Sequence, residues 1–390
     1  MNRKLSKVTI NLKKLLRGHY EAERLPVDFS PDRIVPDFAF NVLNPLGLLY
    51  RPVVAENYLE NGGQKPSWPE GKTFAVCLTH DVDAVSHYSL RQSLRSRKAQ
   101  FSNADSAFEK LKALMGVGLN LASAGIHIKR ILQKDPLHCY ERWLKAEKEC
   151  SAHSTFFFWP GLGVVTKRHH TDCTYELYDS IVFDNQKCTV AEMVQEIGRQ
   201  GWEIGLHPSW YSFDDADALK RQKESLENAL GHEVVSIRQH YLHYDIRITP
   251  AVHAAAGFKY DSTLGFNDNV GFRFGTCYPY HLYDLKAEKE LPIMEIPLII
   301  QDGAMLNPTK GMRLDEETAF QYVKQITEAV GNVGGVLTLL WHPNQIIKDD
   351  WWHLYLRILK YLKEKNVWFG SVREIGAAFI QAQSHTDESE

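Results

Sequence analysis

Two aspartates end an apolar segment of the sequence in a way that suits metal binding or proton transfer. The segment runs Phe74-Ala-Val-Cys-Leu-Thr-His-Asp-Val-Asp83. Side chains alternate along a strand, so Asp81 and Asp83 should point to one face while His80 and Val82 point to the other. The carboxyl ends of parallel strands form the active-site face of a barrel. In a plainer interpretation, one of the two aspartates only caps the turn that follows.

Two histidines follow apolar segments in the same manner. Gly201-Trp-Glu-Ile-Gly-Leu-His-Pro-Ser209 contains His207, and Val336-Leu-Thr-Leu-Leu-Trp-His-Pro-Asn344 contains His342. A neutral imidazole at a strand end is a ready zinc ligand, which predicts that role for His207. His342 is placed to donate a proton to a leaving group. Either histidine could instead be a core residue whose hydrogen bonds are satisfied internally.

A fourth segment, Ser236-Ile-Arg-Gln-His-Tyr241, adds one cation and one imidazole after another predicted strand. Arg238 could orient a carboxylate or polarise a carbonyl group. His240 could be a third metal ligand. A structural role for either residue agrees with the sequence equally well.

The elements that must position these side chains alternate in type from residue 72 onward. Short β-branched and aromatic runs are separated by helical patterns, which is typical of a parallel sheet with crossover helices. The predicted strands are Thr73–Thr79, Ser154–Trp159, Trp202–Leu206, Val234–Arg238, Phe258–Ser262, Ile293–Ile300, Val336–Trp341 and Val367–Gly370. We therefore predict an α/β fold, a distorted or incomplete (β/α) barrel.

Helix boundaries are predicted from capping residues. Thr189 with Glu192 forms a possible capping box, and Thr249 followed by Pro250 is typical of an N-cap and a first-turn proline. Gly231 is typical of a helix stop.

The chain divides into three predicted parts. Residues 1–71 form an N-terminal extension that wraps the barrel, 72–380 form the barrel, and 381–390 form a polar tail. Residues 86–148 are predicted as a helical insertion after the first strand, because a crossover normally needs far fewer residues.

Composition narrows the partners and the compartment. The 45 basic and 48 acidic side chains nearly cancel, so nothing favours a nucleic-acid partner. Six scattered cysteines without a CxxC pair suit reduced thiols in a cytoplasmic protein, and no signal-peptide core is recognised. The uncharged stretch 113–128 is too short for a transmembrane segment. Peripheral contact with a membrane surface is left open.

The order of these motifs resembles that of the NodB-type polysaccharide deacetylases, carbohydrate esterase family 4, over about residues 72–375. Six elements carry the resemblance: Thr79–Asp83 for Thr-Phe-Asp-Asp-Gly, Thr155–Phe157 for Thr-Phe-Phe, His207–Tyr211 for His-Ser/Thr-x-x-His, Arg238–Tyr241 for Arg-x-Pro-Tyr, Tyr260–Ser262 for Tyr-Asp-Ser, and Leu340–His342 for Leu-x-His.

The resemblance implies a fold and a set of roles. The fold is a distorted (β/α)7 barrel, and the activity is hydrolysis of a carbon–nitrogen bond with Zn²⁺ or another divalent metal. Asp81 is then the general base, Arg238 the residue that orients it, His342 the general acid and His207 a metal ligand.

Two departures from the family's motifs alter the implied metal site. Val82 occupies the position of the family's metal-binding aspartate, and Tyr211 replaces the second ligand histidine. The duties then pass to Asp83 and His240, so the predicted ligands are Asp83, His207 and His240. The chain is therefore similar to a divergent branch of the family, whose activity is less secure than its fold.

Three functions are compatible with these residues. The first is removal of an acetyl group from an N-acetylated sugar, in a polysaccharide or in a glycan precursor made on the cytoplasmic side. The second is hydrolysis of another non-peptide C–N bond, as in a cyclic ureide or an amide. The third is carbohydrate binding without catalysis, which Val82 and Tyr211 favour.

Overall fold

The computed structural model describes residues 10–25, 41–102, 104, 106–112, 115, 134–161 and 171–387. The predicted extension (1–71) and insertion (86–148) lie partly outside these residues, and so does most of the uncharged stretch 113–128. None of the described helices combines the length and the apolar character needed to cross a bilayer.

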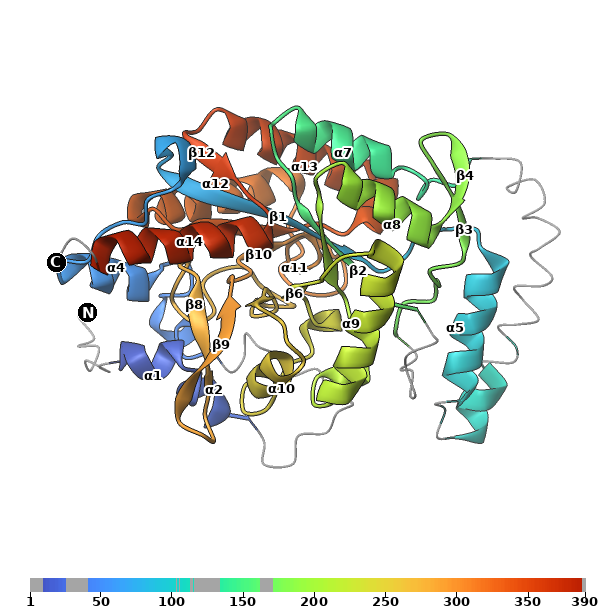
Figure 1. Cartoon of the computed structure of the whole chain (residues 1–390), viewed down its shortest axis with the longest axis horizontal. Coiled ribbons are helices and arrows are strands. Elements are labelled where there is room, and N and C mark those ends of the chain that lie inside the picture. The colour runs from blue at the N-terminus through green and yellow to red at the C-terminus, as the bar shows by residue number, and fades with distance from the viewer. Residues whose placement is uncertain are drawn as a thin grey trace, which may run out of the picture.

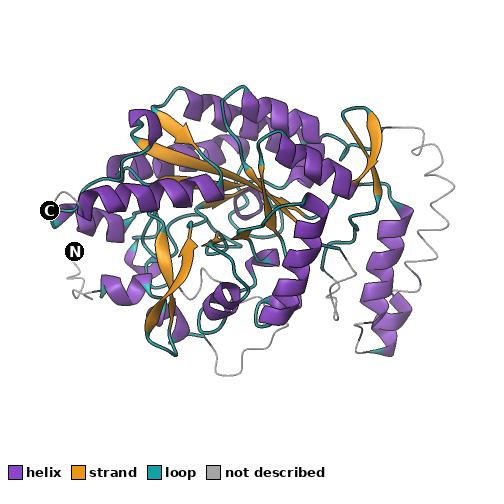
Figure 2. Ribbon diagram, viewed as in Figure 1, coloured by secondary structure: helices purple, strands orange, loops and turns teal. Residues whose placement is uncertain are grey.

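A curled, mostly parallel sheet forms the centre of the molecule, with helices packed around it (Figures 1 and 2). Its strands are β1 (Phe74–Val82), β2 (Thr155–Phe158), β5 (Glu203–Leu206), β6 (Ser236–Ile237), β7 (Tyr260–Asp261), β8 (Tyr280–Asp284), β9 (Lys289–Glu295), β10 (Ile300–Gln301), β11 (Val336–Leu340) and β12 (Val367–Phe369). Their order is β10-β11-β1-β2-β5-β6-β7-β9-β8, and β12 also pairs with β1. The predicted distorted (β/α) barrel is confirmed.

The strand prediction differs from the structure in one predicted run and in two unpredicted hairpins. The run Ile293–Ile300 divides into the end of β9 and the start of β10. Pro297 lies between them, and a proline has no N–H to donate to a strand ladder. The antiparallel hairpin of β3 (Ser180–Phe183) and β4 (Gln186–Thr189), and the pairing of β8 with β9, were not predicted.

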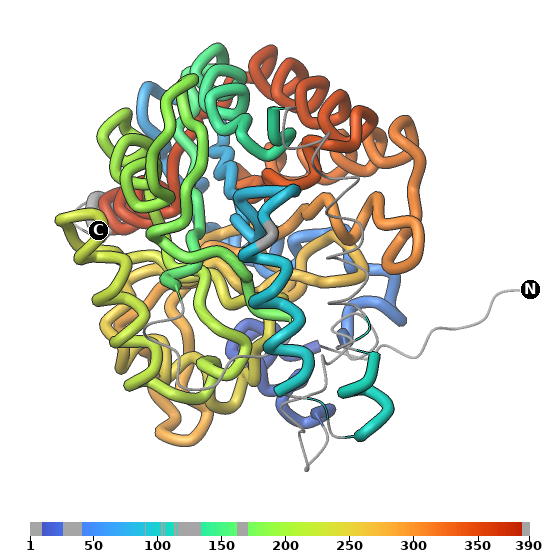
Figure 3. Tube along the Cα trace, turned by 90° about the vertical axis from the view of Figure 1, so that its right-hand side faces the viewer, coloured from blue at the N-terminus to red at the C-terminus, as the bar shows by residue number. Residues whose placement is uncertain are grey.

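The helices of the barrel layer alternate with the strands along the chain. They are α7 (Tyr140–Lys148), α8 (Val190–Arg199), α9 (Ala216–Leu230), α10 (Thr249–Ala255), α11 (Asp302–Leu306), α12 (Glu316–Val333), α13 (Asp349–Lys363) and α14 (Val372–Asp387). Four more lie outside this layer: α1 (Leu12–Leu16), α2 (His19–Ala22), α4 (Val53–Glu60) and α5 (Leu90–Ser102). α5 lies on the outside of the molecule, at the right of Figure 1 and toward the viewer in Figure 3.

Helix boundaries follow the predicted capping residues with one correction. The capping box of Thr189 and Glu192 is present, and Gly231 ends α9 in the left-handed conformation. At α10 the prediction was wrong, because Ile248 is the N-cap and Thr249 is already the first helical residue. The polar tail was also predicted to begin too early, since α14 extends to Asp387.

The two faces of β1 pack against different layers. Phe74, Val76 and Leu78 belong to the large cluster between the sheet and the helices. The alternate residues Ala75 and Cys77 belong to a second cluster with side chains of α14. The same alternation carries Asp81 to the inner face and His80 to the outer one, as the period of a strand requires.

Candidate active site

Asp81 is held at the carboxyl end of β1 by a buried arginine. Its side chain accepts a hydrogen bond of 3.4 Å from Arg238 Nη1, and the two residues are 3% and 0% exposed. Arg238 Nη2 also donates to Thr79 Oγ1 at 3.1 Å and to Ser262 Oγ at 2.9 Å. Its guanidinium lies 4.9 Å above the ring of Phe157. These contacts fix the arginine, so it can hold one carboxylate oxygen of Asp81 in place.

Asp83 follows directly after β1 and lies among three histidines. Its Oδ1 is 3.4 Å from His207 Nε2 and 3.7 Å from His240 Nδ1, while its Oδ2 is 3.8 Å from His342 Nε2. Oδ1 is buried and has no hydrogen-bond partner. A buried carboxylate oxygen without a donor is costly unless a cation compensates it.

Backbone carbonyls set the orientation of two of these rings. His207 Nδ1 lies 2.7 Å from the carbonyl oxygen of Arg238, and His240 Nε2 lies 3.0 Å from that of Thr171. A carbonyl oxygen only accepts, so in the neutral rings these nitrogens carry the hydrogens. The unprotonated nitrogens, His207 Nε2 and His240 Nδ1, then face each other at 2.9 Å.

This donor set fits a divalent transition metal. One carboxylate oxygen and two unprotonated imidazole nitrogens converge, and both rings are anchored from behind as metal-bound histidines usually are. The thiol of Cys173 is a neighbouring donor that the sequence did not reveal. Asp83, His240 and Cys173 can each offer one ligand atom such that all three atoms lie within 4.8 Å of one another.

Electrostatics separate the roles of these groups. Burial disfavours the carboxylate of Asp83, but the hydrogen bond from His207 and the charges of His342 and His240 hold its pKa below the ordinary range. Burial and the neighbouring His207 lower the pKa of His240. Burial opposes protonation of His207 as well, but the charge of Asp81 and the hydrogen bond to Asp83 raise its pKa. A bound cation would reverse the preference of His207 for a proton.

His342 is supported by an acid that was not predicted. Asp302, at the start of α11, is fully buried and lies 2.7 Å from His342 Nδ1 through its Oδ1. Its Oδ2 accepts the backbone N–H of His342 at 2.8 Å. Burial lowers the pKa of His342, but the charge and hydrogen bond of Asp302 outweigh it and raise that pKa to about 10. The ring is therefore a proton donor at neutral pH.

These groups open onto a cavity of about 490 Å³ at the carboxyl end of β1. Among the predicted residues, Asp81, Asp83, His207, His240 and His342 line it, and Arg238 lies buried behind Asp81. Tyr241, which also lines it, adopts the left-handed conformation with φ 57°, and the next residue, Leu242, does so with φ 51°. Such strain in non-glycine residues is concentrated at functional sites.

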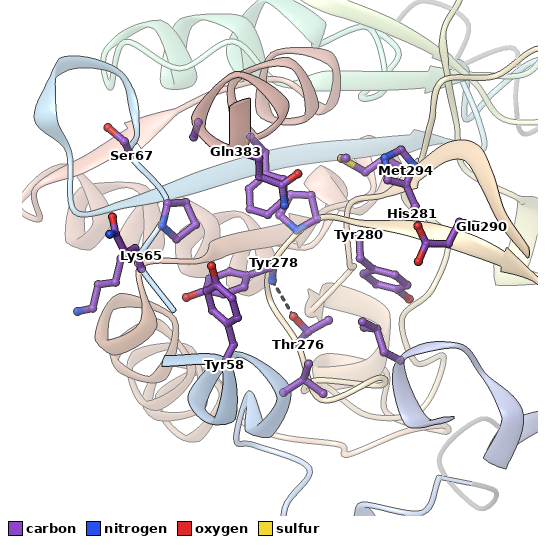
Figure 4. Close-up of a pocket in the computed structure, with 17 residues that line it drawn as sticks. Tyr58, Lys65, Ser67, Thr276, Tyr278, Tyr280, His281, Glu290, Met294 and Gln383 are labelled. Carbon is purple, nitrogen blue, oxygen red and sulfur yellow. Dashed lines mark hydrogen bonds between the residues drawn. The ribbon is translucent and has the colours of Figure 1, made fainter. Parts of the chain in front are cut away.

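A second cavity of about 500 Å³ lies elsewhere, between α4, α14 and the β8–β9 hairpin (Figure 4). Its walls include Tyr58, Tyr278 and Phe379, and Tyr278 N donates to Thr276 Oγ1 at 3.0 Å. No predicted site residue lines this cavity. Chemistry is therefore confined to the first cavity, although the two are almost equal in volume.

Comparisons with known proteins agree with this fold. No family profile matches the sequence, and no curated protein sequence does so. Among solved structures, a Mycobacterium smegmatis protein provisionally described as a polysaccharide deacetylase aligns with a TM-score of 0.53 and 21% identity, over 83% of this chain and 95% of that one. The PuuE allantoinase aligns with a TM-score of 0.50 and 14% identity, over 81% of this chain and 93% of that one.

Identities this low show the fold and no more. The predicted resemblance to the polysaccharide deacetylases is confirmed at that level: the chain has their distorted (β/α) barrel, which the PuuE allantoinase shares.

Proposed function

We propose that this protein is a metal-dependent hydrolase that removes an acetyl group from an N-acetylated sugar. One observation carries the proposal: Asp83 Oδ1, His207 Nε2 and His240 Nδ1 converge within 2.9 to 3.7 Å of one another. The arginine-bound carboxylate of Asp81 and the acid-bound imidazole of His342 line the same cavity. Three ligands with a base and an acid beside them suit hydrolysis by an activated water.

The residues divide the work as follows. A divalent ion such as Zn²⁺, held by Asp83, His207 and His240, would acidify a water molecule and polarise the acetyl carbonyl. Asp81 accepts the proton of the attacking water, and Arg238 keeps its carboxylate ionised and aimed. His342 donates its Nε2 proton to the departing nitrogen, so that the amine and acetate separate. Asp302 holds the His342 ring for that transfer.

The lining of the cavity supports a carbohydrate as the substrate. Amide side chains of Asn267, Asn307 and Gln345 and the aromatic side chains of Tyr241 and Trp351 share the wall with the catalytic groups. Amides can bond sugar hydroxyls and aromatic rings can pack on the sugar face. The substrate is then an N-acetylhexosamine of a polysaccharide or a glycan precursor.

The test is acetate release from N-acetylglucosamine oligomers by metal-loaded protein. Asp81→Asn keeps the shape of the side chain and removes the base, so we expect turnover to fall at least about 100-fold while the fold is retained. His207→Ala should abolish tight binding of zinc, measured by calorimetry on metal-free protein. Near-normal turnover in Asp81→Asn would overturn the assignment of the base.

Hydrolysis of a cyclic ureide is a second candidate, favoured by the shared fold of the PuuE allantoinase. Allantoin and related ureides belong in the same substrate panel, and turnover of these compounds alone would select this candidate. Sugar binding without turnover, in protein that holds no metal, would instead select a non-catalytic carbohydrate-binding protein.

We further propose that the protein acts in the cytoplasm. All six cysteines are free thiols, which suits a reducing compartment. A glycan precursor at the cytoplasmic face of a membrane would be within its reach, and cell fractionation tests this placement.

A further inference from the structure

His80 lies next to the proposed base but points away from it, into the layer between the sheet and the helices. Its ring is fully buried and stacks on Phe156 with ring centroids 4.5 Å apart. Nδ1 lies 2.7 Å from the carbonyl oxygen of Trp341, and Nε2 lies 2.6 Å from Glu147 Oε1. Both ring nitrogens are therefore engaged.

Glu147 is the buried partner supplied by α7. It has no exposed surface, and its oxygens also accept from Trp202 Nε1 at 2.7 Å and from Tyr355 OH at 2.9 Å. Burial alone would favour the neutral acid, but the charge and hydrogen bond of His80 lower the pKa of Glu147. A carboxylate and a carbonyl oxygen both only accept, so the His80 ring donates from both nitrogens.

This pair joins the two strand ends that carry the proposed base and acid. His80 precedes Asp81 in β1, and the carbonyl that it binds belongs to the peptide that joins Trp341 to His342. The same segment is tied to β1 by a hydrogen bond of 3.0 Å from Trp341 N to the carbonyl of Thr79. The three contacts set the position of the His342 backbone relative to Asp81.

Stability alone does not account for an ionic pair at this position. Apolar residues of similar volume usually pack in place of a buried ion pair at no loss of stability. The corresponding residue of the resembled deacetylase motif is phenylalanine, an aromatic ring that could stack on Phe156 without bonding Trp341. What histidine adds is the directional link from β1 to the carbonyl of Trp341.

We propose that His80 and Glu147 are a positioning pair, which holds the His342 segment at the correct distance from Asp81. The proposal rests on the proposed hydrolase function. Displacing a catalytic group by about 1 Å can lower a rate by about 100-fold, so a rigid link between the two strand ends has a direct effect on turnover.

The experiment compares three substitutions. His80→Phe keeps an aromatic ring and removes both hydrogen bonds. His80→Asn keeps an N–H near the position of Nδ1, so it can still bond the carbonyl of Trp341. The matched control is His253→Phe, because His253 pairs with Asp261 at 2.7 Å and both side chains are fully buried. His253 belongs to α10 and does not line the cavity.

Two readouts are measured well below the unfolding temperature: kcat and KM for acetate release, and hydrogen exchange of the backbone amides of residues 340–343. In His80→Phe we expect kcat to fall about 10- to 100-fold with KM within about twofold, and amide exchange to rise at least about tenfold. His80→Asn should recover most of both values. His253→Phe should lower the unfolding temperature and change neither readout.

Unchanged kcat and unchanged exchange in His80→Phe would overturn the proposal, and so would equal changes in His253→Phe. If His80→Phe does not fold, Glu147→Gln replaces it, because it removes the charge and keeps an acceptor oxygen. If wild-type protein releases no acetate from any acetylated sugar, the proposed function fails. The exchange of residues 340–343 then still decides whether His80 positions this segment.

Discussion

Two histidine–carboxylate pairs lie on opposite faces of the sheet, at the ends of the same two strands. His342 and Asp302 are 2.7 Å apart, and the His342 side chain is 18% exposed. His80 and Glu147 are 2.6 Å apart, and neither side chain is exposed. The residue types and the separations are nearly the same. The difference lies in the second ring nitrogen, because His342 Nε2 lines the cavity and His80 Nδ1 binds a carbonyl oxygen.

This difference teaches what allows a paired histidine to act in catalysis. A ring that donates from both nitrogens to fixed acceptors has no site left for a substrate, so it can only hold its neighbours in place. A ring with one nitrogen on a carboxylate and the other open to a cavity can pass a proton to a bound molecule. The first pair should therefore control turnover directly, and the second should control stability and position.

The largest expected effect separates the two pairs by their influence on turnover. His342→Asn keeps an N–H near the position of Nδ1, where it can still bond Asp302, and removes the donor Nε2. We expect kcat for deacetylation to fall about 100- to 10,000-fold, because general acid catalysis is lost. Steady-state kinetics measure this change, and calorimetry should place the unfolding midpoint within a few degrees of wild type. A variant with wild-type kcat would remove the distinction between the pairs.

The second effect concerns stability. Glu147→Leu leaves the buried imidazole of His80 without its carboxylate, and we expect the free energy of unfolding to fall by about 3 to 5 kcal/mol. Urea denaturation measures this loss. The control is Glu196→Gln, which breaks an exposed pair with Arg199 and should change stability by less than about 1 kcal/mol. The double variant His80→Phe/Glu147→Leu should recover most of the loss, and a double variant as unstable as Glu147→Leu would contradict this account of the pair.

The sequence predicts the rim of the site better than the contacts behind it. Strand alternation and the rule that side chains follow strand ends bring together Asp81, Asp83, His207 and His342. The same rule would have pointed to Asp302, which follows Gln301 at the end of β10. It was missed because the predicted strand continued through Pro297, so the true strand end was not recognised.

Other contacts left no periodic signal. Glu147 belongs to an amphipathic helix, where an acid is normally solvated, and its burial depends on His80 from β1, 67 residues away. Thr171 and Cys173 lie in an irregular segment between the predicted strands, and a backbone carbonyl can anchor a histidine whatever side chain it carries. Tertiary contacts of this kind appear only once the chain is folded.

A third prediction tests how the pair at the cavity is tuned. Asp302→Asn removes the charge that raises the pKa of His342 to about 10. Burial then lowers that pKa, so the alkaline limb of the kcat/KM profile should move to lower pH, with a loss of about tenfold at pH 9. Rates measured from pH 6 to 10 test this shift. An alkaline limb at the wild-type position would show that Asp302 does not set the proton affinity of His342.

The smallest expected effect is on stability as a function of pH in metal-free protein. The folded pKa of His342, about 10, lies above its ordinary value of 6.5. The native state therefore binds the proton more tightly than the unfolded chain does. This contribution is fully present below pH 6.5 and is lost as pH rises through 10. Because the side chain is 18% exposed, solvent screening should keep the loss to about 1 or 2 kcal/mol.

Urea denaturation at pH 6.5, 8 and 9.5 in the presence of a chelator measures this loss. Wild-type protein should lose stability across that range, and His342→Asn should lose less because its amide does not titrate. Equal losses in the two proteins would mean that other groups cause the pH dependence. A smaller loss in the variant would assign a proton of the folded state to the histidine beside the cavity, which is the proton that the proposed reaction transfers.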